Sequence, residues 1–301
     1  MKKCLSILVL LAALCAYLPA QTTFRLFFLG GQSNMEGFGR AAELPYVLRG
    51  PVQGVYIFHG NSAADTTQVD GRGLWSILKP GHGAGFSSDG EENKYSDRFG
   101  LELTFARQLR EWYPNDLIAI IKYSRGGTSI ATDPAHKVHC WDPDFNFGNG
   151  INQYDHCLAT IRQAFMDRDI DGDGKDDILI PSGILWMQGE SDGNFSEAIA
   201  LAYEANLKRL MDLIRAALWQ DDLPVVIGRI SDSGQDDADG KVWNHGDLIR
   251  AAQAAFVQTD GHAALVTSTD AYHYSDKWHY DTAGYLDLGR AFAQAIKAWL
   301  E

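Results

Sequence analysis

Five short apolar runs recur along the chain and predict buried β-strands. They lie at residues 24–30, 117–124, 183–189, 224–231 and 263–270. Most of the intervals between them carry apolar residues at helical spacing. These predicted helices span residues 98–113, 154–166, 196–218, 246–258 and 282–300. Apolar strands that alternate with amphipathic helices predict an α/β fold, in which helices cover both faces of a mostly parallel sheet.

Polar residues follow the predicted strands directly. Ser33 comes after the first strand, Ser124–Gly127 after the second and Gln188–Glu190 after the third. In such a sheet, ligands bind beyond the carboxyl ends of the strands. We therefore expect these residues to meet at one edge of the sheet. Residues 40–97 are long, Gly-rich and weakly periodic, and we expect them to form a loop-rich insertion over that edge that shapes a substrate site.

The first twenty residues have the pattern of a secretory signal peptide. Lys2 and Lys3 precede an apolar stretch, and Pro19-Ala20 provides the small residue expected before a signal-peptidase cleavage site. The apolar stretch is too short for a membrane anchor. We expect cleavage of residues 1–20, a single domain over residues 21–301, and a secreted or periplasmic protein.

The charge and the cysteines narrow the classes of partner. The net charge of −13 argues against nucleic acid and anionic membranes as partners and favours a neutral substrate. Two cysteines remain after the signal peptide, Cys140 and Cys157, and in an oxidising compartment they predict a disulfide. Two free thiols are the alternative. The oligomeric state stays open.

The segment SDKWHYD, at residues 275–281, contains a candidate general base and a candidate carboxylate that could act with Ser33 in hydrolysis. A catalytic serine needs a base, a carboxylate that orients the base, and donors for the developing oxyanion. Asp276 and His279 are three residues apart in a predicted turn. Gly126 or Gly127 can present a backbone N–H, and Gln188 can add an amide. Each of these residues alone is commonly structural, but Ser33 at the same edge of the sheet favours catalysis for the set.

Four motifs carry a resemblance to a known family. Gly31-Gln32-Ser33-Asn34-Met35, Gly126-Gly127-Thr128-Ser129, Gln188-Gly189-Glu190-Ser191 and Asp276-x-x-His279 follow one another in the order of the SGNH-type hydrolases. More narrowly, the chain resembles the branch that contains sialate O-acetylesterases and acetylxylan esterases. Met35 stands where an α/β-hydrolase elbow requires Gly, which disfavours that other family.

The resemblance implies a fold and a role for each residue. The fold is a three-layer, flavodoxin-like α/β/α sandwich around a five-stranded sheet. Ser33 is the nucleophile, His279 the base and Asp276 its partner, and no cofactor takes part in catalysis. The oxyanion donors are Ser33, Gly126 or Gly127, and Gln188. The remaining motif residues, which are expected to support the site, are Gln32, Asn34 and Glu190.

The implied activity is removal of acetyl groups from a carbohydrate through an acyl-enzyme. Acetylated, xylan-like polysaccharide and O-acetylated sialic acid are the two substrate classes, and the lack of an obvious basic cluster favours the first. A lipase-like or thioester hydrolase and a non-catalytic carbohydrate-binding protein are alternatives. Trp75, Trp141 and Trp243 either stack on sugar rings or pack inside the domain.

A separate acidic segment, DRDIDGDGKDDI at residues 167–178, suggests a structural Ca²⁺ site. Its candidate ligands are Asp169, Asp171, Asp173 and Asp177, which alternate around two glycines. The segment resembles the calcium loops of thrombospondin-type repeats, although Ile180 stands where an EF-hand has Glu. A solvated acidic loop is the alternative. His136 and His139 have a metal-like spacing but lack an evident third ligand.

Overall fold

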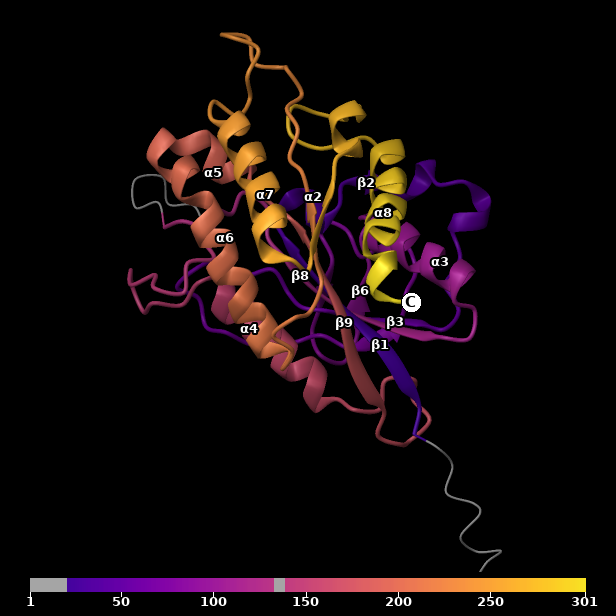
Figure 1. Cartoon of the computed structure of the whole chain (residues 1–301). Helices are drawn as coiled ribbons and strands as arrows, with labels where there is room; N and C mark the ends of the chain where they lie inside the picture. Colours follow the sequence, from indigo (N-terminus) through magenta and orange to yellow (C-terminus); the bar gives the residue numbers. More distant parts are fainter. Residues whose placement is uncertain (1–20, 133–138) are drawn as a thin grey trace, which may run out of the picture.

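A seven-stranded sheet forms the centre of the molecule (Figure 1). The computed structural model describes residues 21–132 and 139–301, so the predicted signal peptide at residues 1–20 lies outside the described part of the chain. The strand order is β11-β10-β9-β1-β8-β3-β4, and all neighbours are parallel except β3 and β4. The strands are β1 (Thr23–Gly31), β3 (Val55–His59), β4 (Trp75–Ile77), β8 (Leu117–Ser124), β9 (Ile178–Met187), β10 (Val225–Gly228) and β11 (Ala263–Val266).

The α/β class and all five predicted strands are confirmed, but the strand number of five is wrong. The two additional strands, β3 and β4, come from the segment expected to be loop-rich, residues 40–97. The apolar run of β3 is four residues long, Val55–Phe58, and lies between Gly-rich stretches, and β4 is an edge strand of three residues. Runs this short give too few residues for periodicity to separate a strand from a loop.

The helices cover both faces of the sheet (Figure 1). On one face α3 (Glu102–Trp112) packs against α8 (Thr282–Ile296), and the other face carries α4 (Gln153–Met166), α6 (Glu197–Ala217) and α7 (Gly246–Asp260). Gly289 permits the close approach of α8 to α3, because a Cβ there would lie 2.3 Å from the Leu101 carbonyl oxygen. The predicted helices are therefore confirmed as the outer layers of a three-layer sandwich.

Local sequence determines where these helices begin. At the start of α4, the Asn152 side chain accepts a hydrogen bond from the Tyr154 N–H, and Asp155 accepts one from the Asn152 N–H. Ser196 and Asp281 cap α6 and α8 with their side-chain oxygens in the same way. Such caps satisfy backbone N–H groups that have no partner within the helix.

Short elements complete the chain between the layers. Two small antiparallel pairs are β2 (Gly39–Arg40) with β7 (Arg98–Phe99), and β5 (Ser87–Ser88) with β6 (Asn93–Lys94). Two short helices follow β1 and β9 directly and are α2 (Ser33–Glu36) and α5 (Glu190–Phe195). Four single turns of 3₁₀-helix are Ala41–Glu43, Tyr46–Leu48, Ser268–Ala271 and Lys297–Trp299.

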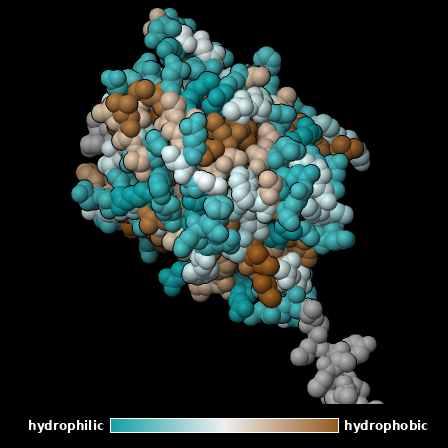
Figure 2. Space-filling view, in the orientation of Figure 1, coloured by the Kyte–Doolittle hydropathy of each residue, from teal (hydrophilic) through white to brown (hydrophobic). Residues whose placement is uncertain are grey.

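On the face shown in Figure 2 the surface is mainly polar, and the apolar residues that reach it form small separate groups. The core lies on both sides of β1, where Phe27 packs edge-to-face on Phe105 of α3 with 5.1 Å between ring centroids. Within residues 21–132 and 139–301, no helix has the length and apolar character needed to cross a membrane.

Candidate active site

The strand register brings the predicted motifs to one level of the sheet. Gly31 of β1 pairs with Ser124 of β8 and with Met187 of β9, and Met187 pairs with Gly228 of β10. These residues end, or nearly end, their strands. The segments that follow them therefore emerge side by side at the carboxyl edge, as the sequence predicts.

The turn that carries Ser33 depends on Gly31. Its φ of +144° is unfavourable for other residues, and a Cβ there would lie 2.0 Å from the Met187 carbonyl oxygen. That same oxygen accepts a hydrogen bond of 2.9 Å from the Gln32 N–H. The chain then turns into α2 at Ser33, whose side chain reaches a pocket although only 8 % of the residue is exposed.

A tight loop before α8 holds His279 and Asp276 together. The Ser275 N–H donates to the His279 carbonyl oxygen at 2.9 Å, which closes the loop. Asp276 Oδ2 lies 2.8 Å from His279 Nδ1, and Oδ1 accepts from the backbone N–H groups of Trp278 and His279. Burial alone would raise the pKa of Asp276, but these hydrogen bonds lower it, so the carboxylate stays charged beside the imidazole.

His279 also has a fixed ring plane. The ring stacks on Phe38 with 3.6 Å between centroids and an angle of 3° between planes. Asp276 at Nδ1 and Phe38 on the ring face leave Nε2 as the nitrogen available for proton transfer.

Ser33 and His279 line one pocket with a volume of about 380 Å³. Its wall is mostly apolar, with a few polar groups, and consists of Gln32, Ser33, Phe38, Gly126, Gly127, Ser191, Asn194, Phe195, Trp243, Trp278 and His279. The Ser33 hydroxyl and the imidazole share it without a direct hydrogen bond, a common arrangement before substrate binds. A larger hollow of about 560 Å³ beside α3 is lined by arginine, glutamine, glutamate, threonine and apolar residues, and no described serine, cysteine or histidine lines it.

The two predicted glycines differ in their surroundings. A Cβ on Gly126 would lie 3.3 Å from Ser33 Cβ and 3.0 Å from Glu36 Oε2, so this position lies directly beside the serine. Burial raises the pKa of Glu36, and a hydrogen bond from the Gly126 N–H opposes that rise. Gly127 follows in a left-handed conformation, with φ of +72°, and also lines the pocket.

Gln188 does not lie where its predicted oxyanion role requires. The residue is fully buried, and its Nε2 donates to the Thr128 carbonyl oxygen at 3.0 Å and to Asp192 Oδ2 at 2.6 Å. Its Oε1 accepts from the Tyr203 hydroxyl at 3.0 Å. The buried Asp192 carboxylate, one helical turn further on, holds the amide away from the pocket.

Gln32, expected only to support the site, reaches the pocket instead. Its Oε1 faces the backbone N–H groups of Gly189 and Ser191 at 3.4 and 3.3 Å, which fixes the orientation of the amide. Its Nε2 donates no hydrogen bond within the described residues, and the side chain lines the pocket beside Ser33. Its position next to Ser33 in the first motif is the only sequence signal for such a role.

Asn34 joins three segments of the site. Its Nδ2 donates to Glu190 Oε1 at 2.8 Å and to the Trp278 carbonyl oxygen at 3.3 Å, and its Oδ1 accepts from the Tyr285 hydroxyl at 2.7 Å. Burial raises the pKa of Glu190, and the hydrogen bond from Asn34 opposes that rise. Asn34 and Glu190 therefore tie the serine turn, α5 and the histidine loop together.

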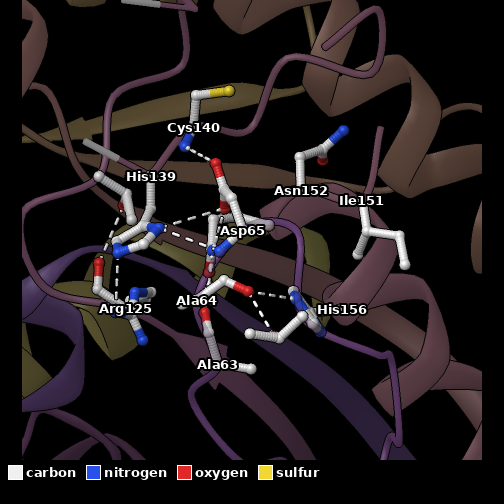
Figure 3. A network of polar contacts seen from close by, with 12 residues as sticks. Ala63, Ala64, Asp65, Arg125, His139, Cys140, Ile151, Asn152 and His156 are labelled. Carbon is white, nitrogen blue, oxygen red and sulfur yellow. Dashed lines mark hydrogen bonds and ion pairs between the residues drawn. The ribbon is translucent and has the colours of Figure 1, made fainter. Parts of the chain in front are cut away.

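A polar network holds Arg125, the residue before Gly126 (Figure 3). Arg125 Nη2 lies 2.9 Å from His139 Nε2, and His139 Nδ1 accepts from the Asp65 N–H at 3.0 Å. Asp65 Oδ2 accepts from the Cys140 N–H at 2.9 Å.

The other histidine of the metal-like spacing, His136, lies outside the described residues. Residues 40–97 thus support the site through Asp65 but do not line the pocket, contrary to expectation.

The predicted disulfide is wrong in this structure, because Cys140 and Cys157 are both free and buried. Cys157 packs in the apolar core on α4, whereas the Cys140 thiol lies 3.8 Å from the Thr132 hydroxyl. Burial raises the pKa of the Cys140 thiol to about 12 and raises that of Cys157 as well, so neither is a reactive thiolate.

The three tryptophans divide between the core and the pocket. Trp141 is fully buried and donates to the Thr128 hydroxyl, and the indole of Trp75 donates to carbonyls at the end of α4. Both are packing residues. Trp243 lines the pocket together with Trp278, which the sequence did not single out.

Comparison with known families agrees with this geometry. Residues 23–298 match the family described as "Carbohydrate esterase, sialic acid-specific acetylesterase". The chain belongs to this family. It is accordingly a carboxylic ester hydrolase of the SGNH-type carbohydrate esterase branch, whose substrates are acetylated carbohydrates.

Solved structures share the fold of this carbohydrate esterase. A protein from Arabidopsis thaliana is 19% identical with a TM-score of 0.63, covering 93% of this chain and 99% of its own. A carbohydrate acetylesterase from Xanthomonas citri is 17% identical with a TM-score of 0.61, covering 91% of this chain and 56% of its own. NanS is 16% identical with a TM-score of 0.58, and the alignment covers 94% of this chain and 99% of the NanS chain. No curated protein matches the sequence.

Proposed function

We propose that this esterase is an exported O-acetylesterase for a neutral, xylan-like polysaccharide, with Ser33 as its nucleophile. One observation carries the proposal: Ser33 shares a pocket with a histidine whose other ring nitrogen is hydrogen-bonded to a carboxylate. That combination supplies a nucleophile, a general base and an orienting group.

In the proposed reaction, Ser33 Oγ attacks the acetyl carbonyl carbon while His279 Nε2 takes the hydroxyl proton. The tetrahedral intermediate collapses, and the sugar oxygen leaves with the proton that His279 returns. A water molecule then gives its proton to His279 and attacks the acyl-enzyme. Acetate leaves and Ser33 recovers its proton. Asp276 stabilises the imidazolium in both halves of the reaction.

Three donors around Ser33 suit the oxyanion. The backbone N–H of Ser33 is the first. The second is the backbone N–H of Gly126 or Gly127, both of which line the pocket beside Ser33. The Gln32 amide is the third, since its Nε2 remains available at the pocket, unlike that of Gln188. Donors directed at the developing charge are the main source of stabilisation in acyl transfer.

The pocket wall favours a neutral sugar. Phe38, Phe195, Trp243 and Trp278 provide apolar and stacking surfaces, and no lysine or arginine among the described residues, 21–132 and 139–301, lines the pocket. The carboxylate of a sialic acid would enter this wall without a cation to pair with, which costs free energy. O-acetylated sialic acid is therefore the second candidate substrate.

The test is acetate release by purified protein, first on a small chromogenic acetyl ester. Ser33→Ala is expected to lower kcat by about 10⁴-fold or more. Ser191→Ala, at the other serine of the pocket, is expected to stay active and serves as the matched control. Turnover that survives Ser33→Ala would contradict the nucleophile. Absence of turnover by the wild type would leave a carbohydrate-binding protein as the alternative. Higher kcat/KM on O-acetyl sialate than on acetylated xylan would overturn the substrate class.

Export rests on residues 1–20 of the sequence. Sequencing the amino terminus of protein recovered from outside the cytoplasm is expected to give a chain that begins at Gln21. Recovery of the uncleaved chain from the cytoplasm would contradict export and would leave the esterase proposal unaffected.

A further inference from the structure

The acidic segment lies at the opposite edge of the sheet from the pocket. It connects the end of α4 at Met166 to the start of β9 at Ile178. Three of its carboxylates, those of Asp169, Asp171 and Asp177, converge so that one oxygen from each lies within 4.8 Å of the others. Asp173, the fourth candidate from the sequence, turns away and pairs with Lys175 at 2.7 Å.

Asp177 provides a second observation, independent of this clustering. The residue is only 5% exposed, and one carboxylate oxygen, Oδ2, accepts from the Ile170 N–H at 2.7 Å. The other oxygen, Oδ1, is buried and has no hydrogen-bond partner among the described residues, and Asp169 Oδ1 is in the same state. Buried carboxylate oxygens without a partner are costly, which indicates a missing positive ligand.

The charges in the segment point the same way. Lys175 is occupied by Asp173 and so does not neutralise the three converging carboxylates.

We propose that Asp169, Asp171 and Asp177 bind a structural Ca²⁺ ion that stabilises the α4–β9 connection. Ca²⁺ takes oxygen ligands at about 2.3–2.6 Å, so two opposite ligands of one ion lie about 5 Å apart, in keeping with the observed spacing. Gly172 and Gly174, both with positive φ, allow the chain to turn around the ion. Backbone carbonyls and water would complete the coordination.

The site joins parts of the chain that are distant in sequence. The Asp177 N–H donates to the Arg168 carbonyl oxygen at 2.7 Å, and the next N–H, that of Ile178, donates to the Thr22 carbonyl oxygen at 2.8 Å. The ion would therefore stabilise the entry to β9 and its pairing with β1, and would take no part in ester hydrolysis.

The experiment is thermal unfolding of chelator-treated protein with CaCl₂, MgCl₂ or neither. At a Ca²⁺ concentration one hundred times the dissociation constant, Tm is expected to rise by about 5 °C or more, and Mg²⁺ is expected to have a smaller effect. Asp177→Asn and Asp171→Asn are expected to abolish the shift. Asn at position 177 keeps an oxygen for the Ile170 N–H, so that variant should fold.

Asp176→Asn is the matched control, since Asp176 is exposed and pairs with Arg168 outside the cluster. It should respond to Ca²⁺ like the wild type. The proposal is overturned if wild-type Tm is insensitive to millimolar Ca²⁺, if Mg²⁺ acts equally, or if Asp177→Asn keeps the full shift. Esterase activity at 25 °C is expected to survive chelation, so this result and the test of Ser33 are independent.

Discussion

At the scale of single residues, two glutamines in neighbouring motifs have different environments. The resemblance to known esterases assigns an oxyanion role to Gln188, but the structure directs its amide at Asp192 and Thr128. Gln32 lies at the pocket with its amide oxygen held by two backbone N–H groups. Which glutamine faces the pocket depends on a buried carboxylate four residues away, and sequence alone does not reveal that contact.

Replacing Gln32 by Glu tests its role as a donor. Glu keeps an oxygen for the Gly189 and Ser191 N–H groups but replaces the amide donor by a negative charge. We expect kcat to fall by about 100-fold or more. Gln188→Ala should instead lower the free energy of unfolding by about 1–3 kcal/mol, because it leaves Asp192 short of a hydrogen bond. Chemical denaturation and steady-state kinetics on both variants measure these effects. A large loss of kcat in Gln188→Ala together with unchanged kcat in Gln32→Glu would restore Gln188 as the donor.

Asp192 makes a pH-dependent contribution to stability. Burial raises its pKa to about 6, although hydrogen bonds from Gln188, Ala131 and Ile130 oppose the rise. A carboxyl with a raised folded-state pKa binds its proton more tightly in the folded protein, so its contribution to stability falls as pH rises from about 4 to 6. The free energy of unfolding of wild type, relative to Asp192→Asn, should fall by about 2 kcal/mol between pH 4.5 and 7.5. A difference independent of pH would contradict this assignment.

At the scale of elements, the site depends on four strands that end level with one another. Periodicity predicts β1, β8, β9, β10 and β11 because these strands are apolar and lie within a sheet covered on both faces. It misses β3 and β4, since short strands in a Gly-rich segment are defined by their neighbours. The sequence also suggests that residues 40–97 cover the pocket, whereas they extend the sheet and brace Arg125 through Asp65.

Asn34 makes the hydrogen bonds that most directly connect α2, α5 and the loop that carries His279. Asn34→Ala leaves the Glu190 carboxylate and the Tyr285 hydroxyl without their partner. We expect the free energy of unfolding to fall by about 1–3 kcal/mol and kcat to fall as well, because α2 and the histidine loop lose their common anchor. Chemical denaturation and kinetics on Asn34→Ala and Asn194→Ala, a second asparagine beside the pocket, provide the comparison. Unchanged stability in Asn34→Ala would show that other contacts position these elements.

At the scale of the whole molecule, the core and the helix layers hold residues 21–132 and 139–301 together without a disulfide between Cys140 and Cys157. Compartment and cysteine number predict a Cys140–Cys157 bridge, but only the fold shows that Cys157 packs in the core while Cys140 lies in a loop. We expect a reducing agent to leave Tm unchanged. A drop of several degrees, with one thiol pair lost on titration of the unfolded chain, would show that the bridge forms.

The central claim concerns Ser33, and an organophosphate ester tests it most directly. Such a reagent modifies an activated serine and forms a stable phosphoryl adduct in place of the acyl-enzyme. Intact-mass and peptide-mass analysis should find one adduct, on the peptide containing Ser33, in proportion to the activity lost. Inactivation with the adduct on another residue such as Ser191, or full activity with Ser33 completely modified, would contradict the account.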